Sequence, residues 1–275
     1  MSQNPLQQFF RQPKIFIELP SHGIYSAEGT IQGNVENIPV YGMTGMDEIL
    51  MKTPDALLTG DSVVKVIESC CPTIKDAWDI SSIDFNLILI AIRIATFGDT
   101  LLISQVCPAC KEDNEYDIKL ANLIDYYKSC SYASKLVLKD LTVNTRPLTY
   151  KQATDISLKN FQLQQQIKQL ESIEDDQKKT EFMAKLFAEL GQLQQEIYEY
   201  GIESVDIGVS VVTERPFISE WLKNCDRNVM DRIKAHFQTN QTTWANPKQK
   251  VQCSECQHEF DAHIEFDEAN FFANA

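Results

Sequence analysis

Basic residues and long apolar runs are scarce in this sequence. Lys and Arg number 25 against 39 Asp and Glu, which gives a net charge of −14. Electrostatic binding to nucleic acid needs clustered positive charge, so this balance argues against a general DNA-binding or RNA-binding role. The most apolar run, Leu87 to Ala95, carries Arg93. It is much shorter than the roughly 20 residues of a membrane span, and we therefore expect a buried core helix and no membrane role.

Signals for export and for catalysis are also missing. The N-terminus, MSQNPLQQFFRQPK, has neither the apolar core nor the cleavage site of a signal peptide. We find no glycine-rich phosphate loop, no Gly-x-Ser-x-Gly elbow and no His-Glu-x-x-His motif. His22 and His236 lie far in sequence from any paired nucleophile, and the carboxylates are scattered. The sequence therefore predicts that the protein is not an enzyme.

The chain does contain enough apolar residues to fold, and it contains many cysteines. Its 275 residues, 43% of them hydrophobic, suffice for two modest domains or for one domain with an insertion. Without an export signal, the eight cysteines are expected in a reducing cytoplasm, where metal binding is commoner than disulfides. Cys70, Cys71, Cys130 and Cys225 have no chelating spacing, and we interpret them as small core residues.

The other four cysteines form two Cys-x-x-Cys pairs, here called knuckles, at Cys107/Cys110 and Cys253/Cys256. Each lies between strand-like segments, and a two-residue spacer lets both sulfurs face one ion. We predict that the knuckles meet around one structural Zn²⁺, as the halves of a split zinc ribbon. Two separate redox motifs and unconnected structural cysteines are the alternatives. His258 or His263 could replace a thiolate, but four cysteines already fill the shell and leave no catalytic position.

Hydrophobic periodicity predicts the remaining elements. Strands are expected at Lys14–Leu19 and Ile38–Tyr41, after a polar, extended arm over 1–14 that would order only on a partner. A helix is expected to begin at Thr44, with Asp47 completing a capping box. Further helices are expected from Pro54 to Gly60, from Ser62 to Cys71 with Asp61 as the cap, and from Ile83 to Phe97. Further strands are expected over residues 100–104, 114–118, 136–138, 141–143, 250–252 and 259–266.

The segment from Thr149 to Tyr200 is rich in Gln, Lys, Glu and Leu and contains no proline. Its apolar spacing predicts two antiparallel helices around a polar link at 172–177, which would be a protein-contact arm or an internal packing element. One more helix is expected from Phe217 to Phe237. The predicted class is α+β, with a mostly helical core, small β-hairpins forming the split ribbon and an inserted helical hairpin. The expected divisions are 1–43, 44–98, 99–148, 149–248 and 249–275.

The order of several short motifs resembles the baseplate hub protein family of contractile-tailed, T-even-type bacteriophages. These motifs are Leu19-Pro20-Ser21-x-Gly23 with Tyr25, Met43–Leu50, Ile92–Gly98 and Cys107–Cys110. The resemblance covers roughly residues 15–150 and, less clearly, the second knuckle; the arm at 150–200 does not match the pattern.

The resemblance implies a structural or assembly protein of the phage tail. It would be made in the host cytoplasm and placed in the virion baseplate, near the hub. Its partners would be other baseplate and tail proteins or the tape-measure protein, with several copies in a symmetric assembly. Two other functions stay open: a zinc-ribbon nucleic-acid-binding or transcription-associated module, and an assembly chaperone absent from the finished particle.

Overall fold

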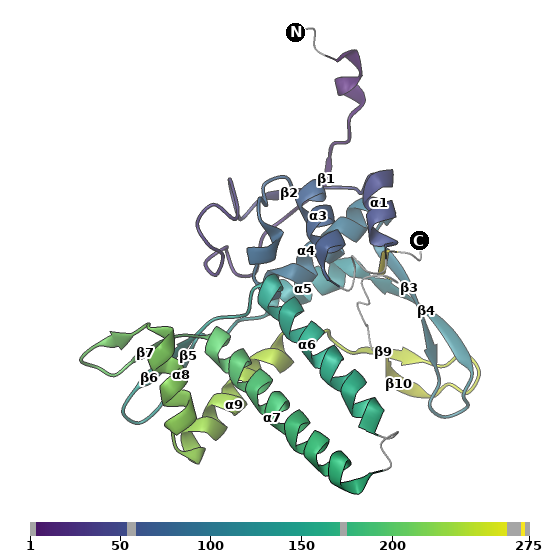
Figure 1. Cartoon of the computed structure of the whole chain (residues 1–275). Coiled ribbons are helices and arrows are strands. Elements are labelled where there is room, and N and C mark those ends of the chain that lie inside the picture. The colour runs from purple at the N-terminus through teal and green to yellow at the C-terminus, as the bar shows by residue number, and fades with distance from the viewer. Residues whose placement is uncertain (1–3, 54–58, 171–174, 263–270, 273–275) are drawn as a thin grey trace. The chain divides into compact units, whose positions relative to one another are not determined.

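The computed structural model describes residues 4–53, 59–170, 175–262 and 271–272 of the chain. It divides into two compact units, of which unit 1 comprises 1–130 with 244–275 and unit 2 comprises 131–243. Helices and small antiparallel sheets make up both units (Figure 1), so the predicted α+β class is confirmed. The finer division into five segments stays a prediction. Among the described residues, no helix combines the length and the apolar character that crossing a bilayer requires.

Unit 1 is built around α4 (Ser82–Phe97), which is buried along most of its length, as its unbroken apolar sequence predicts. The helix ends at Gly98, whose φ of 96° suits a residue without a side chain. The other elements of unit 1 are η1 (Pro5–Phe9), β1 (Pro13–Ile17), β2 (Ile38–Tyr41), α1 (Gly45–Met51), α3 (Asp61–Cys70), η2 (Ala77–Asp79), β3 (Thr100–Val106), β4 (Asp113–Lys119), α5 (Leu120–Ser129), β9 (Gln249–Gln252) and β10 (Glu259–Ala262).

The helix starts of unit 1 follow the local sequence closely. Thr44 and Asp47 form the expected capping box of α1. Helix α3 begins one residue before its predicted start, because Gly60, with φ 81°, occupies the N-cap position expected for Asp61. The predicted helix from Pro54 to Gly60 falls largely on residues 54–58, which lie outside the described residues.

Two further features of unit 1 differ from the sequence expectations. The 3-10 turn η1 lies in the arm that was expected to be extended, and it buries no residue. Helix α5 was not predicted, although Leu120, Leu123 and Tyr127 recur at helical spacing and are buried. The chain re-enters unit 1 over this helix, where the Trp244 ring stacks on that of Tyr127 with centroids 6.3 Å apart.

Two antiparallel strand pairs form the part of unit 1 that carries the knuckles. Strands β3 and β4 pair from Thr100 opposite Lys119 to Val106 opposite Asp113, with the first knuckle at the tip. Strands β10 and β9 pair from Glu259 opposite Gln252 to Ala262 opposite Gln249, with the second knuckle between them. Both hairpins were predicted. Of the strand expected over 259–266, the part beyond Ala262 lies outside the described residues.

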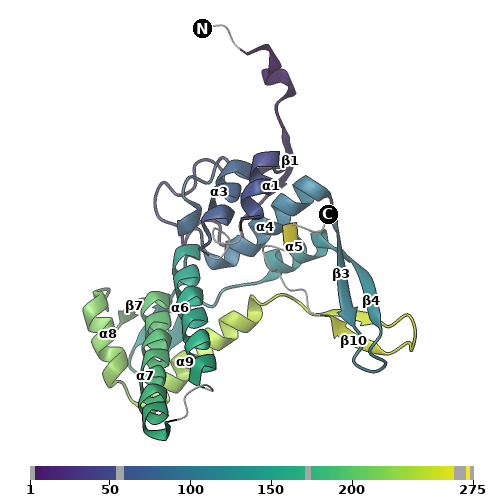
Figure 2. The ribbon, with the colours of Figure 1, turned by 45° about the vertical axis from the view of Figure 1, so that its right-hand side comes forward.

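Unit 2 contains a four-stranded antiparallel sheet and a helical hairpin. The sheet has the order β5-β6-β7-β8, and its core joins Val143, Ile202 and Val205 to Ile218 and Ile233 of two helices. Helices α6 and α7 run side by side in both views (Figures 1 and 2), which confirms the predicted hairpin. The bounds are β5 (Lys135–Val137), β6 (Thr142–Thr145), α6 (Tyr150–Gln169), α7 (Asp176–Gly201), β7 (Ile202–Asp206), β8 (Val211–Val212), α8 (Arg215–Asn224) and α9 (Arg227–Thr243).

One prediction in unit 2 is wrong and one feature was missed. The single helix expected from Phe217 to Phe237 is two helices, because the backbone at Cys225 is extended and the Asp226 carboxylate accepts from the Val229 N–H at 3.0 Å. Asp226 therefore starts a new helix, as aspartate often does. Strands β7 and β8 were not predicted. They turn at Gly208, which has a positive φ of 82°.

Candidate metal centre

The two knuckles have the same backbone geometry. In the first, the Cys107 N–H donates to Glu112 O at 2.9 Å and the Lys111 N–H donates to Cys107 O at 3.0 Å. In the second, the Cys253 N–H donates to His258 O at 3.0 Å and the Gln257 N–H donates to Cys253 O at 3.1 Å. Lys111 and Gln257, each one residue past the second cysteine, both adopt left-handed φ values of 66° and 59°. The two sequences thus fold as equivalent half-sites.

Folding brings the four cysteine sulfurs of the knuckles together. The ligand atoms of Cys107, Cys110, Cys253 and Cys256 all lie within 4.8 Å of one another. The Cys107–Cys256 and Cys110–Cys253 sulfurs are each 3.6 Å apart, so close pairs form between knuckles. A tetrahedral site with metal–sulfur bonds of about 2.3 Å has sulfur–sulfur edges of about 3.8 Å. The spacing therefore fits one tetrahedral ion shared by both knuckles, and it is too long for disulfide bonds of about 2.05 Å.

The backbone N–H groups of the knuckles act on the thiols. Donation from the Cys256 N–H, and then from the Glu255 N–H, lowers the pKa of Cys253 to about 6 although burial opposes this. Burial raises the pKa of Cys107, but the N–H groups of Cys110 and Ala109 outweigh it and the net pKa is lowered. Two thiols of the cluster, one from each knuckle, are thus biased toward the thiolate form that binds metals.

The pKa of Cys110 is shifted in the opposite direction. The Glu112 N–H lowers its pKa, but the neighbouring sulfurs of Cys256, Cys253 and Cys107 raise it to about 12. Four thiolates this close repel one another. A divalent cation bound among them would remove this repulsion, so the donor set suits a soft or borderline cation such as Zn²⁺.

Asn114 connects the two knuckles, a role that the sequence analysis did not identify. Its side chain is buried, donates to Glu112 O at 3.0 Å, and lies 3.5 Å from the Cys253 sulfur. Its Oδ1 accepts from both the N–H and the hydroxyl of Ser254, each at 2.9 Å. Its period-two spacing with Tyr116 and Ile118 along β4 is the sequence signal that could have indicated an inward-facing position.

An aromatic contact also joins the two hairpins. The Tyr116 hydroxyl donates to Gln252 O at 3.0 Å, and its ring meets Phe260 edge-on with centroids 6.3 Å apart. His258, which the sequence left out of the ligand set, stacks its ring on Phe260. His263 lies outside the described residues.

The remaining cysteines lie away from the cluster. Cys70 and Cys71 are fully buried, as expected for core residues, and burial raises the pKa of the Cys70 thiol to about 12. Cys130 and Cys225 are only partly buried, and their thiols donate to Tyr126 O and Leu222 O. None of these four belongs to the metal-type group found among the described residues.

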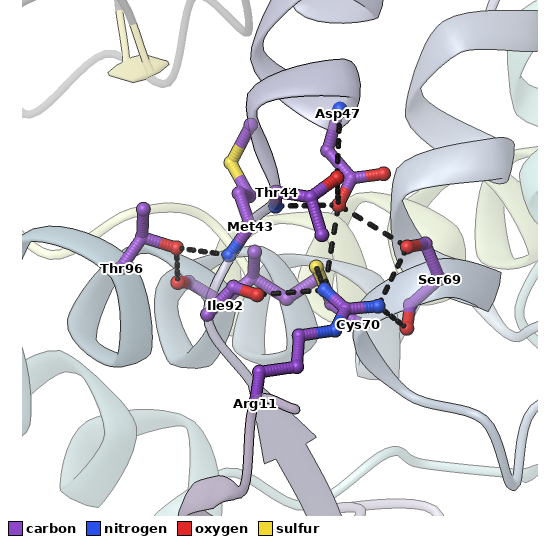
Figure 3. A network of polar contacts seen from close by, with 9 residues as sticks. Arg11, Met43, Thr44, Asp47, Ser69, Cys70, Ile92 and Thr96 are labelled. Atoms are coloured by element: carbon purple, nitrogen blue, oxygen red, sulfur yellow. Dashed lines mark hydrogen bonds and ion pairs between the residues drawn. The ribbon is translucent and has the colours of Figure 1, made fainter. Parts of the chain in front are cut away.

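The motifs behind the family resemblance make structural contacts around α4. The Met43 N–H donates to the Thr96 hydroxyl at 2.9 Å, and this hydroxyl donates to Ile92 O at 2.7 Å (Figure 3). Gly42 lies so close to α4 that a Cβ there would sit 2.9 Å from Ala95 O. Ser21 donates to the buried Asp84 through its N–H at 2.9 Å and its hydroxyl at 2.5 Å. These motif residues therefore stabilise the scaffold.

Arg11 anchors the N-terminal arm to the same scaffold (Figure 3). Its guanidinium donates to Gly42 O at 2.7 Å, to Ser69 O at 2.6 Å and to the Ser69 hydroxyl at 2.9 Å. It also lies 3.4 Å from the buried Asp47 carboxylate, the residue that closes the α1 capping box. The arm is thus fixed at Arg11, while Leu6, Phe9 and Phe10 before it are exposed.

Arg93 anchors the described C-terminal residues. This buried side chain donates to Phe271 O and stacks over the rings of Phe97 and Phe271, each centroid 5.3 Å from its Cζ. Burial lowers the pKa of Arg93. A charged residue inside an apolar helix is the sequence signal for this contact, although its partner could not be named from the sequence.

The fold and the cluster define a class of protein. It has a small α+β scaffold, formed by residues 1–130 and 244–275, that carries a four-cysteine ribbon, and an inserted unit with a four-stranded sheet and a helical hairpin. The family model described as T4 bacteriophage base plate protein matches residues 43–273. The chain therefore belongs to this family of phage baseplate proteins. Searches of curated proteins and of solved structures find no match.

The family match covers residues 43–273, whereas the motif resemblance covers roughly residues 15–150. It includes the segment at 150–200, which the sequence motifs did not relate to the family. It begins at residue 43, after the Leu19–Gly23 motif. Membership of this family implies a tail component that associates with other tail proteins.

Proposed function

We propose that this chain is a non-catalytic structural component of the hub region of the baseplate, held together by one zinc ion. The observation that carries the proposal is the convergence of Cys107, Cys110, Cys253 and Cys256 within one folded unit, although residues 111–252 separate the two knuckles in sequence. Zinc would supply a rigid tetrahedral link between the two hairpins. Four thiolates would fill its coordination shell, which is why we assign it no chemistry.

The hub position is supported by the order of the motifs described above, and the partners we propose are other baseplate proteins or the tape-measure protein. The net charge of −14 disfavours the alternative, a nucleic-acid-binding ribbon. After the first knuckle, Lys111 is followed by Glu112 and Asp113, and the second knuckle contains Glu255. Acidic residues at these positions would repel a phosphate backbone.

The metal is tested on the full chain purified without chelators. Elemental analysis should find one zinc per chain, and a zinc-free protein would contradict the proposed role of the ribbon. Titration with a thiol reagent before and after zinc removal should show that four additional cysteines become reactive. Cys70 and Cys71 should remain slow to react in both states, because they are buried in the unit 1 core.

The hub assignment is tested on purified particles. Mass spectrometry of virions and of isolated baseplates should detect the chain, and cross-linking should join it to central baseplate proteins. Its presence in assembly intermediates and absence from virions would instead identify an assembly chaperone. Retention on heparin or duplex DNA at low salt would favour the nucleic-acid-binding alternative.

A further inference from the structure

The four knuckle cysteines differ in their access to solvent. Cys110 and Cys256, the second cysteine of each knuckle, are exposed, whereas Cys107 and Cys253 are fully buried. Oxidation of a cysteine by a small molecule such as hydrogen peroxide depends on the exposure of its sulfur. In the metal-free chain, the oxidant would therefore reach one sulfur of each knuckle first.

Each exposed sulfur is in contact with a buried sulfur of the other knuckle. The Cys256 sulfur lies 3.6 Å from that of Cys107, and the Cys110 sulfur lies 3.6 Å from that of Cys253. An accessible cysteine beside a second, resolving cysteine is the arrangement in which thiols oxidise reversibly to a disulfide. The cluster contains this arrangement twice. Because the two pairs share no sulfur, both can react in one chain.

Contacts that involve no sulfur hold the two knuckles in this position. The Asn114 Oδ1 accepts from the N–H and the hydroxyl of Ser254. The Tyr116 hydroxyl donates to Gln252 O. Neither contact depends on an ion, so the sulfur pairs should stay adjacent in the metal-free chain. Shortening each separation from 3.6 Å to the disulfide length of about 2.05 Å moves each sulfur by about 0.8 Å when both share the movement.

We propose that hydrogen peroxide oxidises the metal-free ribbon to two disulfides that join the knuckles, Cys107–Cys256 and Cys110–Cys253. In each reaction the exposed sulfur attacks the peroxide, whose O–O bond breaks, and a sulfenic acid and one water form. The buried sulfur then attacks the sulfenic sulfur and releases a second water. Each disulfide thus consumes two thiols and one peroxide, and two electrons pass from the sulfurs to the peroxide oxygens.

The pairing decides what oxidation does to the fold. Disulfides within a knuckle would close loops of a few residues and would leave the two hairpins unconnected. The proposed disulfides connect positions that are 149 and 143 residues apart. A disulfide constrains the unfolded chain more when its loop is longer. Oxidation would then join the two sequence segments of unit 1 covalently. Family membership implies a tail component, and disulfides persist on virions because their surroundings are oxidising.

The inference concerns the same sulfurs as the proposed zinc site, but it rests on their positions and not on the ion. Its test therefore starts from the full chain after treatment with a chelator. A wild type that is purified without zinc would contradict the proposed function, whereas the pairing of the sulfurs is decided by the disulfides that form.

Trypsin separates the alternative pairings, because each knuckle lies within one tryptic peptide. Cleavage after Arg93, Lys111 and Lys250 gives the peptides 94–111 and 251–275. The chain is treated with peroxide, its remaining thiols are alkylated, and it is digested without reductant. Mass spectrometry should then find the two peptides joined by two disulfides. Two separate peptides, each with an internal disulfide, would overturn the proposal, as would peptides that retain their thiols.

Double variants test which sulfurs pair across the knuckles. Cys107→Ser with Cys256→Ser keeps the contacting pair of exposed Cys110 and buried Cys253. The matched control, Cys110→Ser with Cys256→Ser, also keeps one cysteine in each knuckle, but both are buried. The first variant should form its disulfide several-fold faster than the control, because the oxidant reaches one of its sulfurs directly. The rate is followed by the faster migration of the cross-linked chain on non-reducing gels. Equal rates would contradict the assigned pairs.

Stability gives a second measurement that needs no variant. The oxidised metal-free chain should unfold at a higher urea concentration than the reduced metal-free chain, because both disulfides close long loops. An unchanged midpoint would contradict disulfides between the knuckles. Circular dichroism before oxidation verifies that the metal-free chain is folded. Cys130→Ser should behave as the wild type in both measurements, since its thiol lies outside the cluster.

Discussion

The two-knuckle ribbon (β3, β4, β9, β10 and their knuckles) and the helical hairpin of α6 and α7 pose the same physical problem. Each is a small element with few buried apolar side chains of its own. Leu101, Ile118 and Ala262 are buried along the ribbon strands, and Leu163, Leu186 and Leu193 along the hairpin seam. The ribbon also contains four converging sulfurs. The hairpin instead has an ion pair on one flank and exposed apolar side chains on the other.

The ribbon and the hairpin differ in what could stabilise them beyond their few buried apolar side chains. A metal bound by four residues of one chain acts within that chain, so its contribution does not depend on protein concentration. An apolar helix flank covered by another chain is stabilised only to the extent that the other chain is present. A metal bound in the ribbon would therefore close it within one chain, whereas apolar side chains exposed on the hairpin, such as Phe187, are open to contact with another chain.

Loss of a knuckle cysteine should have the largest effect. Cys107→Ser or Cys253→Ser is expected to abolish zinc binding and to destabilise unit 1 by several kcal/mol, because structural metal binding is folding free energy. Elemental analysis and chemical denaturation measure both effects. The helical signal of the hairpin should persist, and Cys130→Ser should retain the metal. Zinc retained at full occupancy in Cys253→Ser would contradict a four-cysteine site.

The corresponding substitution in the hairpin is Leu186→Ala, in the small core between α6 and α7. Removing this 3% exposed side chain should cost about 3 kcal/mol, since it leaves a cavity in a core with few other members. Local unfolding of α7, measured by hydrogen exchange, should increase while the zinc content is unchanged. Ala188→Gly, at an exposed position of the same helix, controls for helix propensity and should cost about 1 kcal/mol. Equal costs for the two would show that the seam does not stabilise the hairpin.

Lowering the pH should act on the ribbon and on the helical scaffold in opposite directions. Acid protonates thiolates and releases the metal. By contrast, burial raises the pKa of Asp84 from 3.8 to about 6, although hydrogen bonds from Ser21 oppose the shift. The folded state therefore binds this proton more tightly than the unfolded state, so stability is greatest below pH 4 and falls as the pH rises to 6. The loss is at most about 3 kcal/mol.

Metal-free protein isolates the effect of Asp84. Asp84→Asn should flatten the slope of unfolding free energy between pH 4 and 6, as measured by urea denaturation. Ser21→Ala should extend the slope to higher pH, because it removes one hydrogen bond that lowers the pKa. If the unfolding free energy of Asp84→Asn still falls between pH 4 and 6, the pH dependence comes from other groups.

The smallest expected effect concerns the contact between the knuckles. Asn114→Ala should cost about 2 kcal/mol, since it removes the buried acceptor of the Ser254 N–H. It should also weaken zinc binding about 10-fold, because Asn114 lies beside the Cys253 sulfur. Competition with a chromogenic chelator measures the affinity. Glu115→Ala, at the neighbouring exposed position, should change neither quantity.

Local signals predicted much of this fold. The capping box at Thr44, the apolar run of α4 and the helical spacing on both sides of the 172–177 link were readable because each depends on residues close together in sequence. The division into α8 and α9 was missed because the apolar spacing continues across Cys225, and only the Asp226 cap interrupts it. Short strands such as β8 depend on their partners in the sheet, which spacing does not reveal.

The sequence by itself determined the four candidate metal ligands, because a Cys-x-x-Cys turn has its chemistry in its spacing. Only the tertiary structure decided that sulfurs from the two knuckles lie 3.6 Å apart and that Asn114 connects them. It also decided that Phe187 is exposed while Leu186 beside it is buried. Such facts depend on contacts between segments distant in sequence, and a helical repeat shows which side chains share a face without showing which face another helix covers.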